Sequence, residues 1–424
     1  MRRTLFLIPH EIGPLTVFGF GWIFGLLVIA LIIRLAIAAR ARSVLGDEAP
    51  SIPAVLASEF VFWGMATFAI FAMPKAELLN AYGEPLGVAV RGYGVFLLLG
   101  VSSAIGLAAF RATRTKSLTQ EHIYSLAPWI IASGLIGARL FYVIQYRDDF
   151  VGASAGETLR NVLAFTQGGL VVYGSIIGGT IGFAIFCYRN RLSALELGDV
   201  VIPAVFLGIC LGRIGCLMNG CCYGGRCEEG WTAVRFPPIN EVYQEQLRSG
   251  ELLGLEVNQP DGVILSVQPD SVGESRGVQP GEIYEGGRLD PRPLETADPD
   301  VPRGDVELGW VASVSGRPIT FEPDQLPDRA LPVRAAQLIS SVTALVLCLS
   351  LCVLSRFVSR AGILMLIGFA AYAVIRFILE MIRVDEAGQF NTSLSISQWV
   401  SVVVLSASIV GLFWIGRQPV KPNE

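Results

Sequence analysis

The chain has 424 residues, of which 52% are apolar and only 16% are charged, whereas soluble domains carry about 25% charged residues. This composition argues against a soluble globular protein. The net charge of -4 gives no sign of a nucleic-acid partner, and two histidines are too few for a histidine-based metal enzyme.

Long apolar segments follow one another along most of the chain. A helix needs about 20 apolar residues to cross a bilayer core, and about nine segments meet this requirement. They lie at about 17–39, 54–73, 88–110, 122–145, 168–188, 199–219, 335–354, 361–382 and 397–416. The sequence therefore predicts an all-α polytopic membrane protein with about nine transmembrane helices.

Basic residues in short loops predict the orientation of these helices, because such residues mark cytoplasmic ends. They follow every odd-numbered predicted helix, as Arg40, Arg42, Arg111, Arg114, Lys116, Arg189, Arg191, Arg356, Arg360, Arg417 and Lys421. We therefore expect the N-terminus outside and the C-terminus inside.

One segment, residues 225–331, differs from the rest. It has 20 acidic and 9 basic residues and 12 of the 23 prolines, so we expect an extracytoplasmic insert. Residues 262–273 and 314–319 alternate apolar and polar positions between turn signals, which predicts short strands and loosely resembles a PDZ-like module. Proline-rich connections without a packed domain are the alternative, because 291–304 has the composition of an unstructured segment. The sequence identifies no partner for the insert.

Three arginines, Arg139, Arg213 and Arg376, lie inside predicted helices, each six residues before the outer end, or about 9 Å at helical rise. A charge at this depth costs at least a few kcal/mol, so it indicates a function. Guanidinium groups bind phosphate in a bidentate way. The alternative is that these arginines bind no substrate. Their long side chains would then extend to the lipid headgroups, or Arg376 would pair with Glu380 to join helices.

Other polar residues accompany these arginines. One polar stripe, at spacings of four, four and three, consists of Tyr372, Arg376, Glu380 and Arg383. Tyr93 and Tyr173 stand at the outer ends of two further helices. We expect a polar cavity open to the outer leaflet.

The segment 211–224 reads Leu-Gly-Arg-Ile-Gly-Cys-Leu-Met-Asn-Gly-Cys-Cys-Tyr-Gly. Its glycines allow a headgroup or a second helix to approach the backbone, and Asn219 supplies an amide. Gly174, Gly178 and Gly182, at four-residue spacing, are instead typical of helix packing.

This segment resembles the signature of the bacterial prolipoprotein diacylglyceryl transferases. The resemblance extends in order through Arg91-Gly-Tyr-Gly94, Gly137-Ala-Arg-Leu140, Gln167-Gly-Gly-Leu170, Tyr372 with Arg376 and Glu380, and Ser397-Gln398. It covers about 85–416 without the insert. It implies four parts: two additional N-terminal helices (1–84), a first part of the transferase core (85–224), the insert (225–331) and a second part of the core (332–424).

The resemblance implies transfer of a diacylglyceryl group from phosphatidylglycerol to the lipobox cysteine thiol of a preprolipoprotein, at the outer face of the bacterial cytoplasmic (inner) membrane. Phosphatidylglycerol, preprolipoprotein signal peptides and the bilayer are then the expected partners, and no cofactor or metal is expected. The implied catalytic residues are Arg213, Arg376 and Tyr173. The implied substrate-binding residues are Tyr93, Arg139, Asn219, Gly220, Gly224, Tyr372, Glu380 and Arg383.

The chain departs from the family pattern at several positions. Tyr173 stands where many members have histidine, and a tyrosine with its ordinary pKa of about 10 is a poor general base at neutral pH, which leaves the proton acceptor open. Cys216 and Cys221 stand where asparagine and glutamate are frequent, and residues 333–337 retain only Gln337 of a His-Pro-x-Gln motif.

Four cysteines form a C-x4-CC-x4-C cluster, Cys216, Cys221, Cys222 and Cys227. Its spacing is not a recognised zinc pattern, so the sequence favours small buried thiols, with a disulfide among the last three as an alternative. The other cysteines, which lie in apolar helices and are predicted to be core residues, are Cys187, Cys210, Cys348 and Cys352.

Three rival functions stay open at this point. A transporter would also have a polar cavity among glycine-rich helices, but the chain shows no paired broken helices and no inverted repeat. A membrane thiol oxidoreductase would depend on the paired cysteines, whereas a transferase depends on Arg213 and Arg376. A non-catalytic phospholipid-binding protein would share the whole site.

Overall fold

The computed structural model describes residues 4–45, 60–147, 150, 154–163, 169, 171–258, 260–296, 298–303, 306–382 and 392–417. The chain divides into two compact units. The N-terminal and insert unit comprises Met1–Val95, Met218–Cys221 and Arg226–Val333, and the helical unit comprises Phe96–Leu217, Cys222–Gly225 and Arg334–Glu424. Each unit is described by itself.

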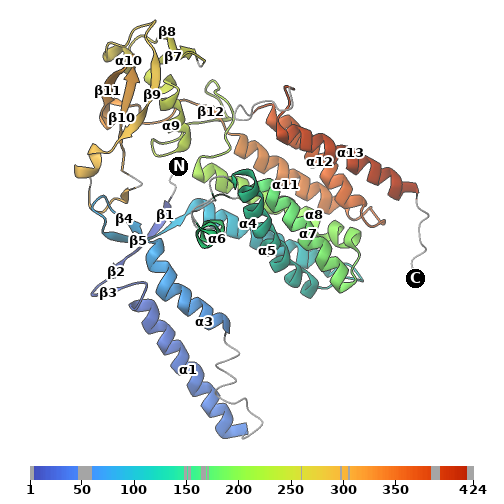
Figure 1. Cartoon of the computed structure of the whole chain (residues 1–424). Coiled ribbons are helices and arrows are strands. Elements are labelled where there is room, and N and C mark those ends of the chain that lie inside the picture. Colours follow the sequence, from blue (N-terminus) through green and yellow to red (C-terminus); the bar gives the residue numbers. More distant parts are fainter. Residues whose placement is uncertain are drawn as a thin grey trace. The chain divides into compact units, whose positions relative to one another are not determined.

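The helical unit is built from long apolar helices (Figure 1). They are α4 (Gly92–Ala112), whose residues from Phe96 on belong to this unit, α5 (Gln120–Gln145), α7 (Val172–Asn190), α8 (Ala194–Asn219), α11 (Ala336–Leu354), α12 (Ile363–Glu380) and α13 (Ile396–Arg417). The short helix α6 (Ala155–Leu163) lies between α5 and α7 in the sequence. Helix α5 packs along α7, and α12 contacts both α11 and α13.

Eight helices among the described residues are long and apolar enough to cross a membrane, namely α1 (Trp22–Leu45), α4, α5, α7, α8, α11, α12 and α13. They confirm the polytopic membrane fold and eight of the predicted spans. The remaining predicted span, 54–73, begins outside the described residues. Its described part is α3 (Phe60–Thr67), followed by the π-turn η2 (Phe68–Ala72) and the 3-10 turn η3 (Met73–Ala76).

Glycines allow α5 and α7 to approach closely. A Cβ atom added to Gly137 would collide with the backbone of α7, and one added to Gly174 or Gly178 would collide with the backbone of α5. This confirms that the glycines spaced by four residues serve helix packing. Around α8, buried side chains such as Phe206, Leu351 and Leu364 form the core, which also includes the thiols predicted to lie there.

The N-terminal part of the other unit contains a small sheet that the sequence analysis did not predict. Strand β1 (Thr4–Pro9) pairs with β5 (Pro85–Arg91), and β5 pairs with β4 (Leu78–Leu79), all antiparallel. A short hairpin joins β2 (Glu11–Ile12) to β3 (Leu15–Thr16). The two ends of the N-terminal extension are thereby tied together.

The insert is a packed, strand-containing domain, as the alternation of apolar and polar residues predicted. Its elements are β6 (Ala233–Val234), α9 (Glu241–Arg248), η6 (Glu251–Leu253), β7 (Leu255–Asn258), β8 (Val263–Val267), α10 (Val272–Ser275), β9 (Tyr284–Asp290), η7 (Arg292–Thr296), β10 (Gly309–Val314), β11 (Arg317–Phe321) and η9 (Pro323–Gln325), with β12 (Val333–Arg334) at its end. Strands β9, β10 and β11 form one antiparallel sheet in the order β11-β10-β9. Trp310, Phe321 and Phe236 are at most 1% exposed, so the alternative of proline-rich connections without a core was wrong. The PDZ-like resemblance stays a prediction.

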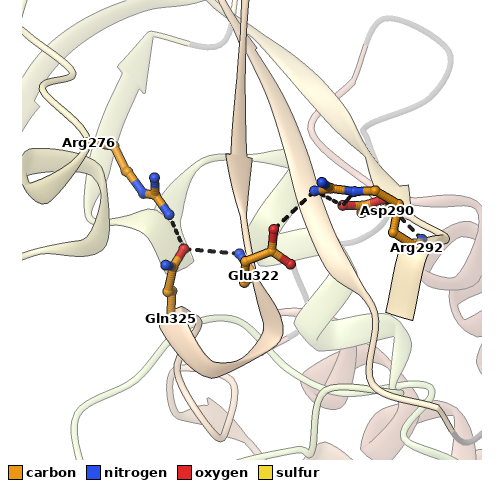
Figure 2. Close-up of polar contacts among 5 residues, drawn as sticks. All are labelled: Arg276, Asp290, Arg292, Glu322 and Gln325. Atoms are coloured by element: carbon orange, nitrogen blue, oxygen red, sulfur yellow. Dashed lines mark hydrogen bonds and ion pairs between the residues drawn. The ribbon is translucent and has the colours of Figure 1, made fainter. Parts of the chain in front are cut away.

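A chain of polar contacts links the sheet of the insert to the turn after it (Figure 2). Arg292 donates to both carboxylate oxygens of Asp290, through its backbone N–H and its guanidinium, and its Nη2 also donates to Glu322 at 3.1 Å. Gln325 accepts from the backbone N–H of Glu322 and from the guanidinium of Arg276. The hydrogen bonds from Arg292 lower the pKa of Asp290.

The N-terminal extension and the insert also contact each other within their unit. The side chain of Asn80 donates to the carbonyl of Pro299 at 3.2 Å, and Asn80 forms a β-bridge with Pro302. The hydroxyl of Tyr82 donates to the carbonyl of Glu295 at 3.5 Å. Segments that are more than 200 residues apart in the sequence thus form one compact unit.

Candidate functional site

A buried polar network joins three helices of the helical unit around Arg376. Nη1 of Arg376 lies 2.5 Å from Oε2 of Glu380, one turn later on α12. Its Nη2 donates to the hydroxyl of Ser397 on α13 at 3.0 Å, and the hydroxyl of Tyr173 on α7 lies 3.0 Å from the same oxygen. The structure therefore brings together three of the residues predicted for the site.

The network continues at the start of α13. Ser395 donates to Oε1 of Glu380 at 3.0 Å, and the side-chain carbonyl of Gln398 accepts from the backbone N–H of Ser395. Glu380 is only 5% exposed, so its charge is balanced by Arg376 and by the hydroxyl of Ser395 instead of by water. Ser395 and Ser397 were not predicted as site residues, although Ser397-Gln398 was part of the resemblance.

A pocket of about 380 Å³ opens beside this network. Its lining residues are Phe377, Glu380, Met381, Ser393, Leu394, Ser395 and Gln398. A carboxylate, two serine hydroxyls and an amide give it a polar character that is unusual among helices of this apolarity, so it suits a small polar group better than a hydrocarbon chain.

Arg213 is half-buried near the end of α8. No hydrogen bond or ion pair that the structure places among the described residues involves its guanidinium. Because an arginine in a membrane-spanning helix normally has a partner, Arg213 is a candidate for binding an anionic ligand.

Arg139 is in a different situation from the other two arginines. It is 5% exposed, and its guanidinium donates to the backbone carbonyls of Asn161, Val162 and Gly169. It also lies over the rings of Tyr142 and Phe150. These contacts favour a structural role for Arg139, which differs from both alternatives that the sequence left open, namely headgroup contact and pairing with Glu380.

The remaining predicted residues are placed as follows. Tyr372 is half-buried on α12, with its ring 5.5 Å from that of Phe206 on α8. Gly224 donates its backbone N–H to the carbonyl of Arg334, and an added Cβ would lie 2.9 Å from Cβ of Arg334. Gly224 therefore allows two backbone segments to approach closely.

Three further predicted residues, Tyr93, Asn219 and Gly220, belong to the N-terminal and insert unit. Gly220 has a φ of 74° directly after α8, which lets the chain turn there. Arg383 lies outside the described residues, as do Gln167, Gly168 and Leu170 of the quoted motif.

Two thiols of the cysteine cluster belong to the helical unit, Cys216 and Cys222. Their sulfur atoms lie within 4.8 Å of each other. The disulfide that the sequence left as an alternative was among Cys221, Cys222 and Cys227, so the proximity of Cys216 to Cys222 was not predicted.

Comparisons with known proteins identify the family of the chain. A sequence model of the family "prolipoprotein diacylglyceryl transferase" matches residues 84–414. A phosphatidylglycerol–prolipoprotein diacylglyceryl transferase from Rhodopirellula baltica is 44% identical, over 98% of this chain and 90% of its own length. Proteins of the same name from Clostridium tetani and Thermosynechococcus vestitus are 33% and 31% identical, over 33% and 41% of this chain and 54% and 63% of their own lengths. The chain therefore belongs to the prolipoprotein diacylglyceryl transferase family.

Proposed function

We propose that this transferase moves the diacylglyceryl group of phosphatidylglycerol to the lipobox cysteine thiol of a preprolipoprotein signal peptide, at the outer face of the bacterial cytoplasmic membrane. The observation that carries the proposal is the Arg376–Glu380 pair beside a polar pocket, within a helix apolar enough to span a membrane. Charged side chains cost free energy inside a membrane, so the presence of this pair indicates a function.

The reaction exchanges one bond to a glycerol carbon for another. The thiolate sulfur forms a C–S bond to the carbon of the diacylglyceryl group that carries the phosphate. The C–O bond from this carbon to the phosphate breaks, and glycerol phosphate leaves with the electron pair. The thiol loses its proton before the attack, and nearby cations favour the thiolate. Negative charge therefore grows on the phosphate oxygen as the bond breaks.

Arg376 is proposed to stabilise that charge. Its described contacts use Nη1 once and Nη2 once, whereas a guanidinium has five N–H donors, so donors remain for a phosphate. Glu380 and Ser397 fix the direction of the group before the lipid arrives, and a preorganised donor of this kind is worth most in a site without water. Arg213 supplies a second cation for the same phosphate.

Tyr173 is proposed to position Ser397 and thereby Arg376, because its hydroxyl shares the Ser397 oxygen with Nη2 of Arg376. Tyr372, Asn219 and Tyr93 are proposed to contact the lipid or its headgroup, as the resemblance implies. The proposed orientation, with the N-terminus outside, is supported by the basic residues in the short loops on the opposite side.

The test incubates the purified protein in phosphatidylglycerol vesicles with a lipobox peptide and measures the thioether product by mass spectrometry. We expect product with the native peptide, none with a peptide whose cysteine is replaced by serine, and none with Arg376→Ala. If the lipid binds but no thioether forms, under conditions in which a relative such as the Rhodopirellula baltica protein is active, the chain is a phospholipid-binding protein and the proposal is wrong.

A further inference from the structure

An apolar groove of about 370 Å³ runs between α4, α5 and α8, away from the polar network. All of its lining side chains are apolar, and several of them are glycine or alanine. On α4 the lining extends from Leu97 to Ala108, which is about 16 Å at helical rise. One leaflet of a bilayer has about the same hydrocarbon thickness, half of roughly 30 Å.

The groove leads towards Arg213. Val201, Val205 and Ile209 line it at four-residue spacing on α8, and Arg213 is the next residue of the same stripe. Side chains on a helix are directed back towards its N-terminus, so we expect the guanidinium of Arg213 to extend over the turn of Ile209. A cation thus stands at one end of an apolar channel.

Two of the glycines that line the groove lie where α4 and α8 come close together. Gly208 and Gly100 approach each other, because a Cβ added to Gly100 would lie 3.1 Å from the carbonyl oxygen of Gly208. One turn further, a Cβ added to Gly212 would meet no atom within 4 Å. The side of α8 at Gly212, the residue before Arg213, is therefore not covered by described atoms.

We infer that this groove binds one acyl chain of the lipid donor while Arg213 holds the phosphate of the same molecule. The inference rests on the proposed function, and it adds where the hydrocarbon of the substrate lies. A single extended chain fits both the length and the apolar lining.

The test compares the length of the acyl chain with the position of a substitution along the groove. Val205 is eight residues before Arg213 on α8, or about 12 Å at helical rise, and it is 42% exposed. Val205→Trp fills the groove at that depth, so it blocks a long chain but not one that ends before it. The matched control is Val346→Trp on α11, a 57% exposed valine outside the groove.

The substrates are phosphatidylglycerols with two 18-carbon or two 8-carbon chains, measured with the same peptide acceptor. For Val205→Trp we expect KM for the long-chain lipid to rise about tenfold, the loss expected when about two methylene groups are no longer buried. We expect KM for the short-chain lipid to stay within twofold of the native value, which also shows that the variant folds. Ile209→Trp, one turn from Arg213, should raise both KM values.

Equal effects of Val205→Trp on both lipids, or the same effect from Val346→Trp, would overturn the inference. If the native protein turns over neither lipid, the proposed function fails instead. Equilibrium binding of the two lipids to the same variants then tests whether the groove binds an acyl chain. The affinity of Val205→Trp must fall for the long-chain lipid and stay unchanged for the short-chain lipid, as expected for KM.

Discussion

Asp199 on α8 caps the N-terminus of α12, where its carboxylate accepts the backbone N–H groups of Gly362 at 2.6 Å and Met365 at 2.7 Å. A helix normally takes this cap from its own preceding residue, but Gly362 has no side chain. Arg111 on α4 supports the contact by donating to the carbonyls of Asp199 and Val200. The helix that carries Arg213 is thereby tied to the helix that carries Arg376.

We expect Asp199→Ala to lower the free energy of unfolding by about 1–3 kcal/mol, because two buried N–H groups lose their acceptor. Asp199→Asn keeps one acceptor oxygen and should lose about half as much. Thermal unfolding of the protein in detergent measures both. Glu196→Ala, one turn earlier, is the control, because the only described hydrogen bond of the Glu196 side chain is with Ser117. If alanine at both positions lowers the free energy of unfolding equally, the cap by Asp199 does not stabilise α12.

Arg376→Lys should reduce kcat/KM by about 100-fold or more, as removal of a preorganised donor does in other enzymes. A lysine keeps the charge, but it cannot reach Glu380 and Ser397 in the planar geometry of a guanidinium. Arg213→Lys should cost less, because the described contacts of Arg213 impose no such geometry. Steady-state kinetics with the lipobox peptide give both values. A native rate for Arg376→Lys would contradict the assigned role.

Arg139 is expected to matter for stability and not for the reaction. In Arg139→Met, the carbonyls of Asn161, Val162 and Gly169 lose their shared donor. The free energy of unfolding should therefore fall by about 2–3 kcal/mol. The KM of the folded fraction for phosphatidylglycerol should stay within twofold. A large rise of KM without loss of stability would restore Arg139 to the substrate-binding residues.

The cysteine pair distinguishes a transferase from a thiol oxidoreductase. A transferase uses the thiol of its substrate, so Cys216→Ala combined with Cys222→Ala should leave at least about a third of kcat, the cost of minor repacking. An oxidoreductase would lose all activity. The measurement is thioether formation by the double variant, with a free-thiol assay confirming the substitutions.

The insert should become less stable in acid. Because Arg292 lowers the pKa of Asp290 in the folded protein, the contact stabilises the fold above the unfolded pKa of about 3.9, and this stabilisation is lost as the pH falls through the lower, folded value. Hydrogen exchange of β9 and β10 in the whole protein, between pH 6 and pH 3, measures the change. Asp290→Asn should remove most of the pH dependence, whereas an unchanged profile would exclude Asp290 as its source.

The membrane spans could be predicted from the sequence because their requirement is local: an uninterrupted apolar stretch of sufficient length. Strands β8 and β11 were likewise visible as alternating residues. The sheet of β1 and β5 was missed, because its partners are about 80 residues apart and one of them runs directly into α4.

The polar site was predicted in part. The spacing of Arg376 and Glu380 placed them on one face of a helix, so their contact was foreseeable. The contact between Tyr173 and Ser397 depends on how α7 packs against α13, and no local pattern encodes that. The same limit applies to Arg139, whose carbonyl partners lie on a segment more than 20 residues later.

The contacts of Asn80 with Pro299 and Pro302 have an evolutionary consequence. Asn80 precedes the region shared with the family, which starts at residue 84, and its partners lie in the acidic insertion. The resemblance implies that both segments are additions to the transferase core, and these contacts join them. Lineages should therefore gain or lose them jointly, and the Rhodopirellula baltica protein, aligned over 98% of this chain, fits that expectation.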